Sequence, residues 1–103
     1  MSVLNVNKEN FDIKVLKSEK TVLLDFFADW FGHCRMVSPL VDEIATEYPQ
    51  YLVGKINVDE EPELATAFEV SSIPMLAVLK GGKLVSKSVG ARPKAQILEM
   101  LED

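Results

Sequence analysis

Two hydrophobic periods alternate along this chain, and that alternation limits the possible fold more than any other feature of the sequence. Short, largely apolar runs typical of buried strands cover residues 21–28, 51–58 and 75–80. Between them, apolar residues recur every three or four positions, which is the period of a helix with one buried face. Strands that alternate with helices favour parallel pairing through right-handed crossovers. We therefore expect an α/β fold, a central mixed sheet with helices on both faces.

The clearest helical pattern covers residues 34–48. Its acidic residues lie on one side, and a single apolar stripe lies on the other. Proline suits the first position of a helix, so Pro62 and Pro93 are expected to open two further helices. The apolar stripe of the 34–48 helix consists of Val37, Leu40, Val41, Ile44, Ala45 and Tyr48.

A hairpin and a short first strand complete the pattern. Gly81 and Gly82 separate the third strand from a fourth over residues 83–89, because glycine accepts the positive φ of a two-residue turn. A strand is expected around residues 3–6, followed by a helix that Asn7 caps. The predicted order is β-α-β-α-β-α-β-β-α, in one domain over residues 1–103. The helix after Asn7 is expected to turn Phe11, Val15 and Leu16 inward.

Charge and hydropathy exclude several functional classes. Eleven Lys and Arg against sixteen Asp and Glu give a net charge of −5, which disfavours nucleic-acid binding and docking on an anionic membrane. No apolar run approaches the ~20 residues of a membrane-spanning helix. Residues 1–9 lack the apolar stretch of a signal peptide, so we expect a cytoplasmic protein. A secreted protein whose signal has been removed is the alternative.

The sequence contains one cysteine, Cys34. A single cysteine excludes an internal disulfide and the multi-thiolate zinc and iron–sulfur sites, so we expect neither metal nor cofactor. Cys34 falls in the first turn of the 34–48 helix, where free N–H groups favour the thiolate. The alternative is an inert thiol that packs as a small hydrophobic residue.

Three other residues near Cys34 in the pattern carry possible chemistry. Asp25 lies inside the most apolar strand, where burial would raise the pKa of its carboxyl; the alternative is an outward-facing side chain. Pro74 directly precedes a strand and is a candidate for a cis peptide bond, with an ordinary trans bond as the alternative. His33 adjoins Cys34, and here the alternative is an exposed loop histidine with no role.

These features resemble the thioredoxin family along the whole chain. The resemblance implies the thioredoxin fold, a cis Ile73–Pro74 bond beside the active site, and a buried Asp25 under Cys34 that Lys55 tunes. It also implies a protein-disulfide reductase in cell redox homeostasis. The implied substrate-binding residues are Trp30, Gly32, His33, Ile73, Pro74, Met75 and Gly90. The matching residues are 24–30, Gly32, Cys34, Pro39, 55–59, 73–74 and 89–91.

The chain departs from the family at one decisive position. The family signature is Trp-Cys-Gly-Pro-Cys or Trp-Cys-Gly-His-Cys, whereas this chain reads Trp-Phe-Gly-His-Cys over residues 30–34. Phe31 replaces the attacking cysteine, and Cys34 keeps the resolving position. Dithiol–disulfide exchange needs both thiols in succession, so we expect it to be lost or severely impaired. Natural divergence and an engineered change are both compatible with the sequence.

Two other functions remain open at this stage. An apolar surface around Trp30 and Pro74 could bind protein substrates or partners without reacting, and Met75 could either make that surface more apolar or only pack beneath it. Cys34 could carry monothiol redox chemistry. Superfamily peroxidases need a threonine at the position of Phe31, so that analogy is weak. The resemblance gives thioredoxin reductase as a candidate partner, and we expect a monomer.

Overall fold

The elements follow the predicted order. A computed structural model of the chain describes residues 3–102; Met1, Ser2 and Asp103, at the ends of the predicted domain, lie outside the described residues. None of the helices within residues 3–102 is long and apolar enough to cross a membrane. The elements are β1 (Leu4–Asn5), the π-helical turn η1 (Asp12–Leu16), β2 (Thr21–Phe27), α1 (Cys34–Glu47), β3 (Tyr51–Asn57), α2 (Pro62–Ala67), β4 (Met75–Lys80), β5 (Lys83–Val89) and α3 (Lys94–Glu102).

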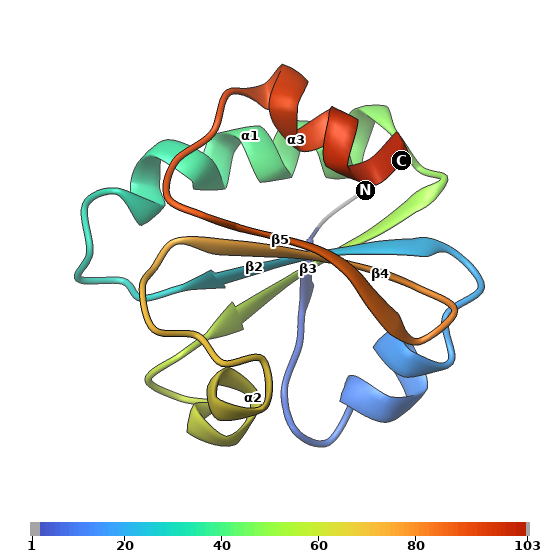
Figure 1. Cartoon of the computed structure of the whole chain (residues 1–103), viewed down its shortest axis with the longest axis horizontal. Helices are drawn as coiled ribbons and strands as arrows, with labels where there is room; N and C mark the ends of the chain where they lie inside the picture. The colour runs from blue at the N-terminus through green and yellow to red at the C-terminus, as the bar shows by residue number, and fades with distance from the viewer. Residues whose placement is uncertain (1–2, 103) are drawn as a thin grey trace.

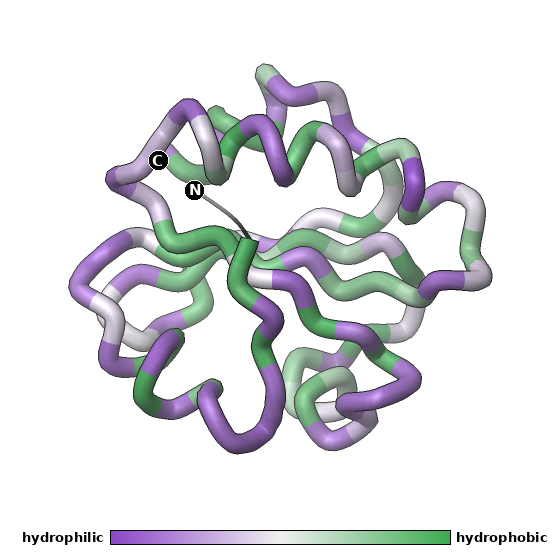
Figure 2. Tube along the Cα trace, turned by 180° about the vertical axis from the view of Figure 1, so that it is seen from behind, coloured by the Kyte–Doolittle hydropathy of each residue, from purple (hydrophilic) through white to green (hydrophobic). Residues whose placement is uncertain are grey.

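The strands form one mixed sheet in the order β1-β3-β2-β4-β5. Helices α1 and α3 cover one face, and α2 and η1 cover the other (Figure 1). Each face has its own core: Leu23, Val53 and Leu76 pack under α1 and α3, whereas Leu24 and Phe26 belong to the opposite cluster. Hydrophobic residues follow the central strands, and hydrophilic ones concentrate in the surrounding loops (Figure 2). The predicted α/β sheet with helices on both faces is confirmed.

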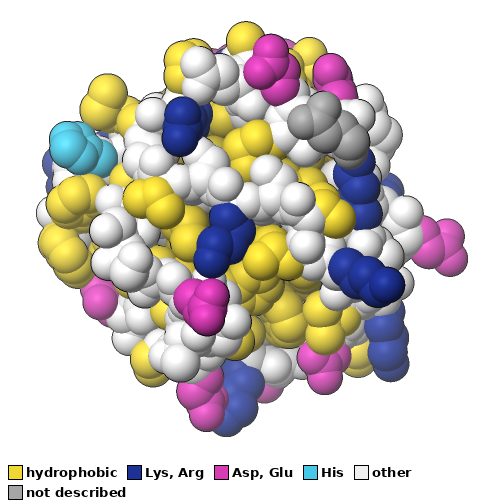
Figure 3. Space-filling view, in the orientation of Figure 1, with side chains coloured by type: hydrophobic (Ala, Val, Ile, Leu, Met, Phe, Trp, Pro, Cys, Tyr) yellow, Lys and Arg dark blue, Asp and Glu magenta, His cyan; other side chains and the backbone are white. Residues whose placement is uncertain are grey.

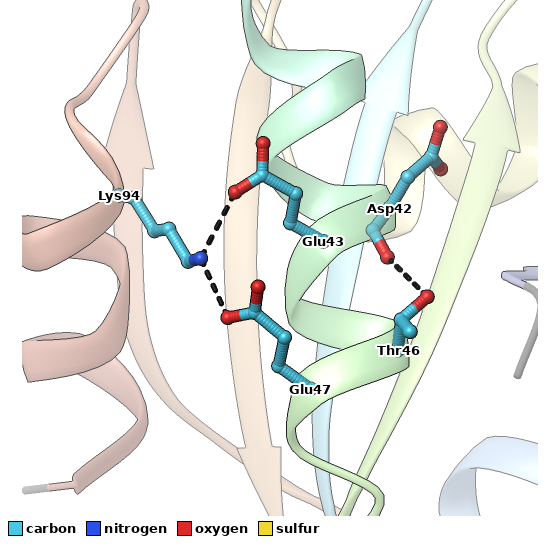
Figure 4. Close-up of polar contacts among 5 residues, drawn as sticks. All are labelled: Asp42, Glu43, Thr46, Glu47 and Lys94. Atoms are coloured by element: carbon cyan, nitrogen blue, oxygen red, sulfur yellow. Dashed lines mark hydrogen bonds and ion pairs between the residues drawn. The ribbon is translucent and has the colours of Figure 1, made fainter.

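Helices α1 and α3 are also joined by polar contacts. Lys94 Nζ donates to Glu43 Oε1 at 2.9 Å and to Glu47 Oε1 at 2.7 Å, so one cation joins two carboxylates of the neighbouring helix (Figure 4). Within α1, the Thr46 hydroxyl donates to the carbonyl oxygen of Asp42. The two contacts of Lys94 join α3 to α1 on the face of the sheet that carries Cys34.

Strand β4 departs from simple strand–helix alternation, because it runs antiparallel to β2. The alternation predicted a parallel strand after α2. Strand β3 has seven residues and spans about 23 Å, whereas the six residues of α2 span about 9 Å. A helix that short cannot return the chain to the opposite end of the sheet. Strand β4 therefore begins at the edge where β3 ends, and Met75 pairs with Phe26.

The predicted helix after Asn7 is reduced to the short turn η1. Asn7 acts as a cap: its Oδ1 accepts from Asn10 N–H at 2.8 Å, and Asn10 Oδ1 accepts from Asn7 N–H at 2.9 Å. Val15 is buried and Phe11 half-buried, as predicted. The inward orientation predicted for Leu16 is wrong, since this residue is 38% exposed. A five-residue turn has too few positions to bury more than a narrow stripe.

Candidate active site

The end of β2 and the start of α1 bring the predicted reactive residues to one face of the sheet. Asp25 on β2 pairs in register with Lys55 on β3, so their side chains lie on the same side as Leu23 and α1. Cys34 is the first residue of α1 and is 4% exposed. The predicted group of Asp25, Cys34 and Lys55 therefore lies beneath the first turns of α1.

Asp25 is buried without a hydrogen-bond partner. It is 1% exposed, and neither carboxylate oxygen is bonded to any residue that the structure describes. Burial raises the pKa of this carboxyl from 3.8 to about 7; Lys55 opposes the rise, and Asp42 adds to it. The buried carboxyl predicted from the apolar strand is confirmed. Asp25 is therefore a group that exchanges a proton near neutral pH.

The environment of Cys34 disfavours the thiolate. Burial raises the pKa of the thiol; a hydrogen bond with the Ala28 backbone lowers it, and the charge of Asp25 raises it further. The expectation that the start of the helix would favour a thiolate is therefore wrong here. The loss of water around the sulfur is the largest cause of the shift and outweighs the hydrogen bond with the Ala28 backbone. The expected shielding of Cys34 is confirmed by its low exposure.

Lys55 is held by residues of α1, and no hydrogen bond joins it to Asp25. Its Nζ donates a short hydrogen bond to Ser38 Oγ and lies 3.8 Å from Asp42 Oδ1. The same ammonium lies 5.7 Å from the centre of the Phe27 ring. Sequence reasoning missed Ser38. The signal was its position one helical turn after Cys34, on the same side of α1.

The residues before Cys34 form an aromatic row in which Trp30 and His33 are exposed and Phe31 is half-buried. The rings of Trp30 and Phe31 meet edge to face at 5.7 Å, and those of Phe31 and His33 at 5.2 Å. Trp30 is 67% exposed, and its Nε1 donates to Asp59 Oδ2 at 2.7 Å. Sequence reasoning did not assign a role to Asp59, although it lies only two residues after the end of β3. Gly32, also exposed, separates Phe31 from His33.

The loop before β4 supplies the second side of the site. The Ile73–Pro74 peptide bond is cis, and Pro74 is buried while Ile73 is half-buried. The Pro74 carbonyl oxygen accepts from Gly90 N–H at 2.8 Å, and Gly90 takes a φ of +95°. Of the two roles open for Met75, the structure favours packing beneath the surface. Its side chain is 1% exposed because residue 75 begins β4 and faces the core under Phe26.

Two cavities show which predicted residues the fold brings together. One of about 180 Å³ reaches Cys34, Ser38 and Lys55 from the end of β2. Another, of about 220 Å³, lies between Trp30 and Ile73. The site therefore combines a shielded thiol, a neighbouring carboxyl that titrates near pH 7, and an exposed apolar rim. Such an arrangement can bind an extended chain at the rim and exchange protons below it.

Comparisons with known proteins agree with this geometry. A sequence model described as Thioredoxin matches residues 2–103. The thioredoxin of Acidithiobacillus ferridurans is 43% identical over 102 residues, which is 98% of this chain and 94% of the relative. The thioredoxin of Streptomyces clavuligerus is 45% identical over 94 residues, 91% of this chain and 88% of that one.

Structural comparison gives the same assignment. One solved chain superposes on this one with a TM-score of 0.87. It comes from work on the thiol resolving mechanism of a yeast mitochondrial 1-Cys peroxiredoxin through glutathione and thioredoxin systems. It is 27% identical, and the match covers 98% of this chain and 94% of that chain. The sequence match extends over nearly the whole chain, and the fold places a cysteine at the start of α1. This chain therefore belongs to the thioredoxin family.

Proposed function

We propose that this member of a disulfide oxidoreductase family has lost the dithiol–disulfide cycle and keeps the surface that binds its protein partners. The observation that carries the proposal is Phe31, an aromatic ring at the attacking position in front of a Cys34 that is 4% exposed. In the complete cycle, one thiolate attacks a substrate disulfide and a second resolves the mixed disulfide. Phe31 has no atom that can attack sulfur. Cys34 is shielded, and its raised pKa keeps it protonated.

Insulin reduction with dithiothreitol tests the loss of turnover. We expect the chain to add nothing measurable to the rate with dithiothreitol alone. Phe31→Cys should restore turnover, because Asp25, Cys34 and Pro74 are in place. Phe31→Ser is the matched control, since it removes the ring without adding a thiol. Turnover by the unaltered chain near that of a two-cysteine thioredoxin would overturn the proposal.

The aromatic row supports a second function, a binding module that does not react. Trp30 is fixed by Asp59 yet 67% exposed, and a 220 Å³ cavity separates it from Ile73. A pre-formed apolar rim of this kind suits an extended peptide segment. Titration with a cysteine-free apolar peptide, followed by tryptophan fluorescence and calorimetry, should show binding that Trp30→Ala removes. Equal calorimetric affinity for both chains would argue against this surface.

The finer assignments follow from the same proposal. Thioredoxin reductase is the partner expected for a chain whose dithiol is restored, so NADPH-dependent reduction of Phe31→Cys by that enzyme tests the pairing.

Monothiol chemistry at Cys34 is less well supported, because burial and the charge of Asp25 both raise the pKa of the thiol. A sequence with a single cysteine also fits a cytoplasmic location, where structural disulfides are rare. Fractionation of cells that express the full chain would test that location.

A further inference from the structure

Strand β5 forms an open edge of the sheet. Strand β4 pairs with one side of it, and no strand within residues 3–102 pairs with the other. Three large apolar side chains on this strand are exposed: Leu84 at 45%, Val85 at 52% and Val89 at 49%. Figure 3 looks onto this side of the molecule and shows hydrophobic side chains lying between Lys and Arg side chains. An edge of this kind offers backbone donors and acceptors to an added strand.

The charge around this edge is opposite to that of the chain as a whole. Residues 70–98 contain five Lys and Arg and no Asp or Glu, and Lys94 among these is paired with carboxylates of α1. The rest of the chain has six Lys and Arg against sixteen acidic residues. Lys83 and Lys87 lie on β5 itself, and Arg92 follows it. The charge of Lys87 is partly balanced by Glu69, since Lys87 Nζ lies 4.0 Å from Glu69 Oε1. The edge therefore presents a basic surface on an acidic protein.

A hollow beside β5 provides a place for side chains of an added strand. Its volume is about 340 Å³, and it lies between β5 and α3. Arg92 lines it and is oriented by the bond from its Nε to Ser88 Oγ at 2.7 Å. Glu99 also lines it, so one carboxylate already shares the space with the guanidinium. Pockets that alternate along an edge give strand addition its specificity.

We propose that β5 binds an extended acidic segment of another protein by strand addition. Backbone groups of the segment would pair with the outer edge of β5. Its apolar side chains would cover Leu84 and Val89, and its carboxylates would face Lys83 and Arg92. The charge selects the occupant, because a second copy paired through the same edge would bring two basic strands together. The register shift between Val78 and Leu79 also disfavours self-pairing of a flat edge.

The test uses an acetylated eight-residue peptide in which Glu and Val alternate, with a Lys and Val peptide as its counterpart. Proton–nitrogen correlation spectra of the full chain should show shifts along residues 83–89 with the acidic peptide only. Lys83→Glu should weaken its affinity at least tenfold, whereas Lys8→Glu, at an ion pair with Glu63, should leave it unchanged. Circular dichroism shows whether both variants remain folded. Higher salt should weaken binding by the unaltered chain.

Several results would overturn the proposal. These are the absence of shifts at millimolar peptide, equal binding of the two peptides, or shifts confined to the surface around Trp30. Self-association through β5 would also overturn it. It would appear as a dimer in sedimentation and as spectral shifts at residues 83–89 on dilution, and the occupant of the edge would then be a second copy of the chain. None of these results bears on the loss of turnover at Phe31, so the two proposals fail independently.

Discussion

At the scale of single residues, Asp25 is the one buried charged side chain among the described residues, and its burial opposes folding when it is ionised. It is 1% exposed, has no hydrogen-bond partner among the described residues, and has a pKa raised from 3.8 to about 7. A raised pKa means that the folded chain binds this proton more tightly than the unfolded chain. The stabilisation of the folded chain by this bound proton is therefore fully present below about pH 4. It is lost as the pH rises through about 7.

Removing that charge should stabilise the protein at high pH. We expect Asp25→Asn to unfold with a larger free energy than the unaltered chain at pH 8, by up to about 4 kcal/mol. The difference should shrink steadily as the pH falls toward 4, since both chains then carry a neutral group. Urea unfolding across that range measures it. Asp29→Asn, at an exposed position two residues beyond β2, is the control and should show no such trend. A difference independent of pH would contradict the burial argument.

The thiol of Cys34 should react slowly. Burial and the charge of Asp25 raise its pKa, and only 4% of the residue is exposed. Labelling with a disulfide reagent at pH 7 should be far slower than in the urea-unfolded chain, and the rate should climb with pH. Asp25→Asn should accelerate labelling, because one cause of the raised pKa is gone. If the folded and unfolded chains label equally fast at neutral pH, the thiol is not shielded.

At the scale of elements, the hairpin between β4 and β5 turns on two glycines, and only the second has a neighbour that leaves no room for a side chain. Gly81 and Gly82 both have positive φ, +59° and +78°. A Cβ at Gly81 would meet nothing within 4 Å, whereas one at Gly82 would lie 2.9 Å from the Leu16 carbonyl oxygen. Gly81→Ala should therefore cost about 1 kcal/mol in unfolding free energy for the conformation alone. Gly82→Ala should cost clearly more, which thermal and urea unfolding would show. Equal costs would mean that Leu16 moves freely.

The same scale shows what the sequence could predict. The strands at β2 to β5 and the helices α1 to α3 were predictable because their apolar periods match how each element is buried. The antiparallel course of β4 was not, because it depends on the length of α2 rather than on the pattern within β4. The burial of Asp25 followed from its apolar neighbours. Spacing placed Ser38 beside Cys34, but the sequence does not show that Ser38 contacts Lys55 or that Asp59 contacts Trp30.

At the scale of the whole molecule, the two proposed binding surfaces are joined by β5 but separated along it. Val89 pairs with Met75 next to the cis bond, whereas Lys83 pairs with Lys80 at the other end of the strand. Seven residues of strand span about 23 Å, beyond the distance at which substitutions usually interact. A partner along the whole edge would therefore end beside the Trp30 surface, yet residues at the two ends should act independently.

This separation predicts additive effects. Lys83→Glu should leave the turnover of Phe31→Cys in insulin reduction unchanged, and Trp30→Ala should leave affinity for the acidic peptide unchanged. With either peptide, the double variant should lose as much affinity as the single variant at that peptide's own site, within about 0.5 kcal/mol, because the sites share no contact. Calorimetric titration of the single and double variants with each peptide measures the coupling. A coupling well above that value would show that the edge and the aromatic rim form one continuous binding site, with β5 as its link.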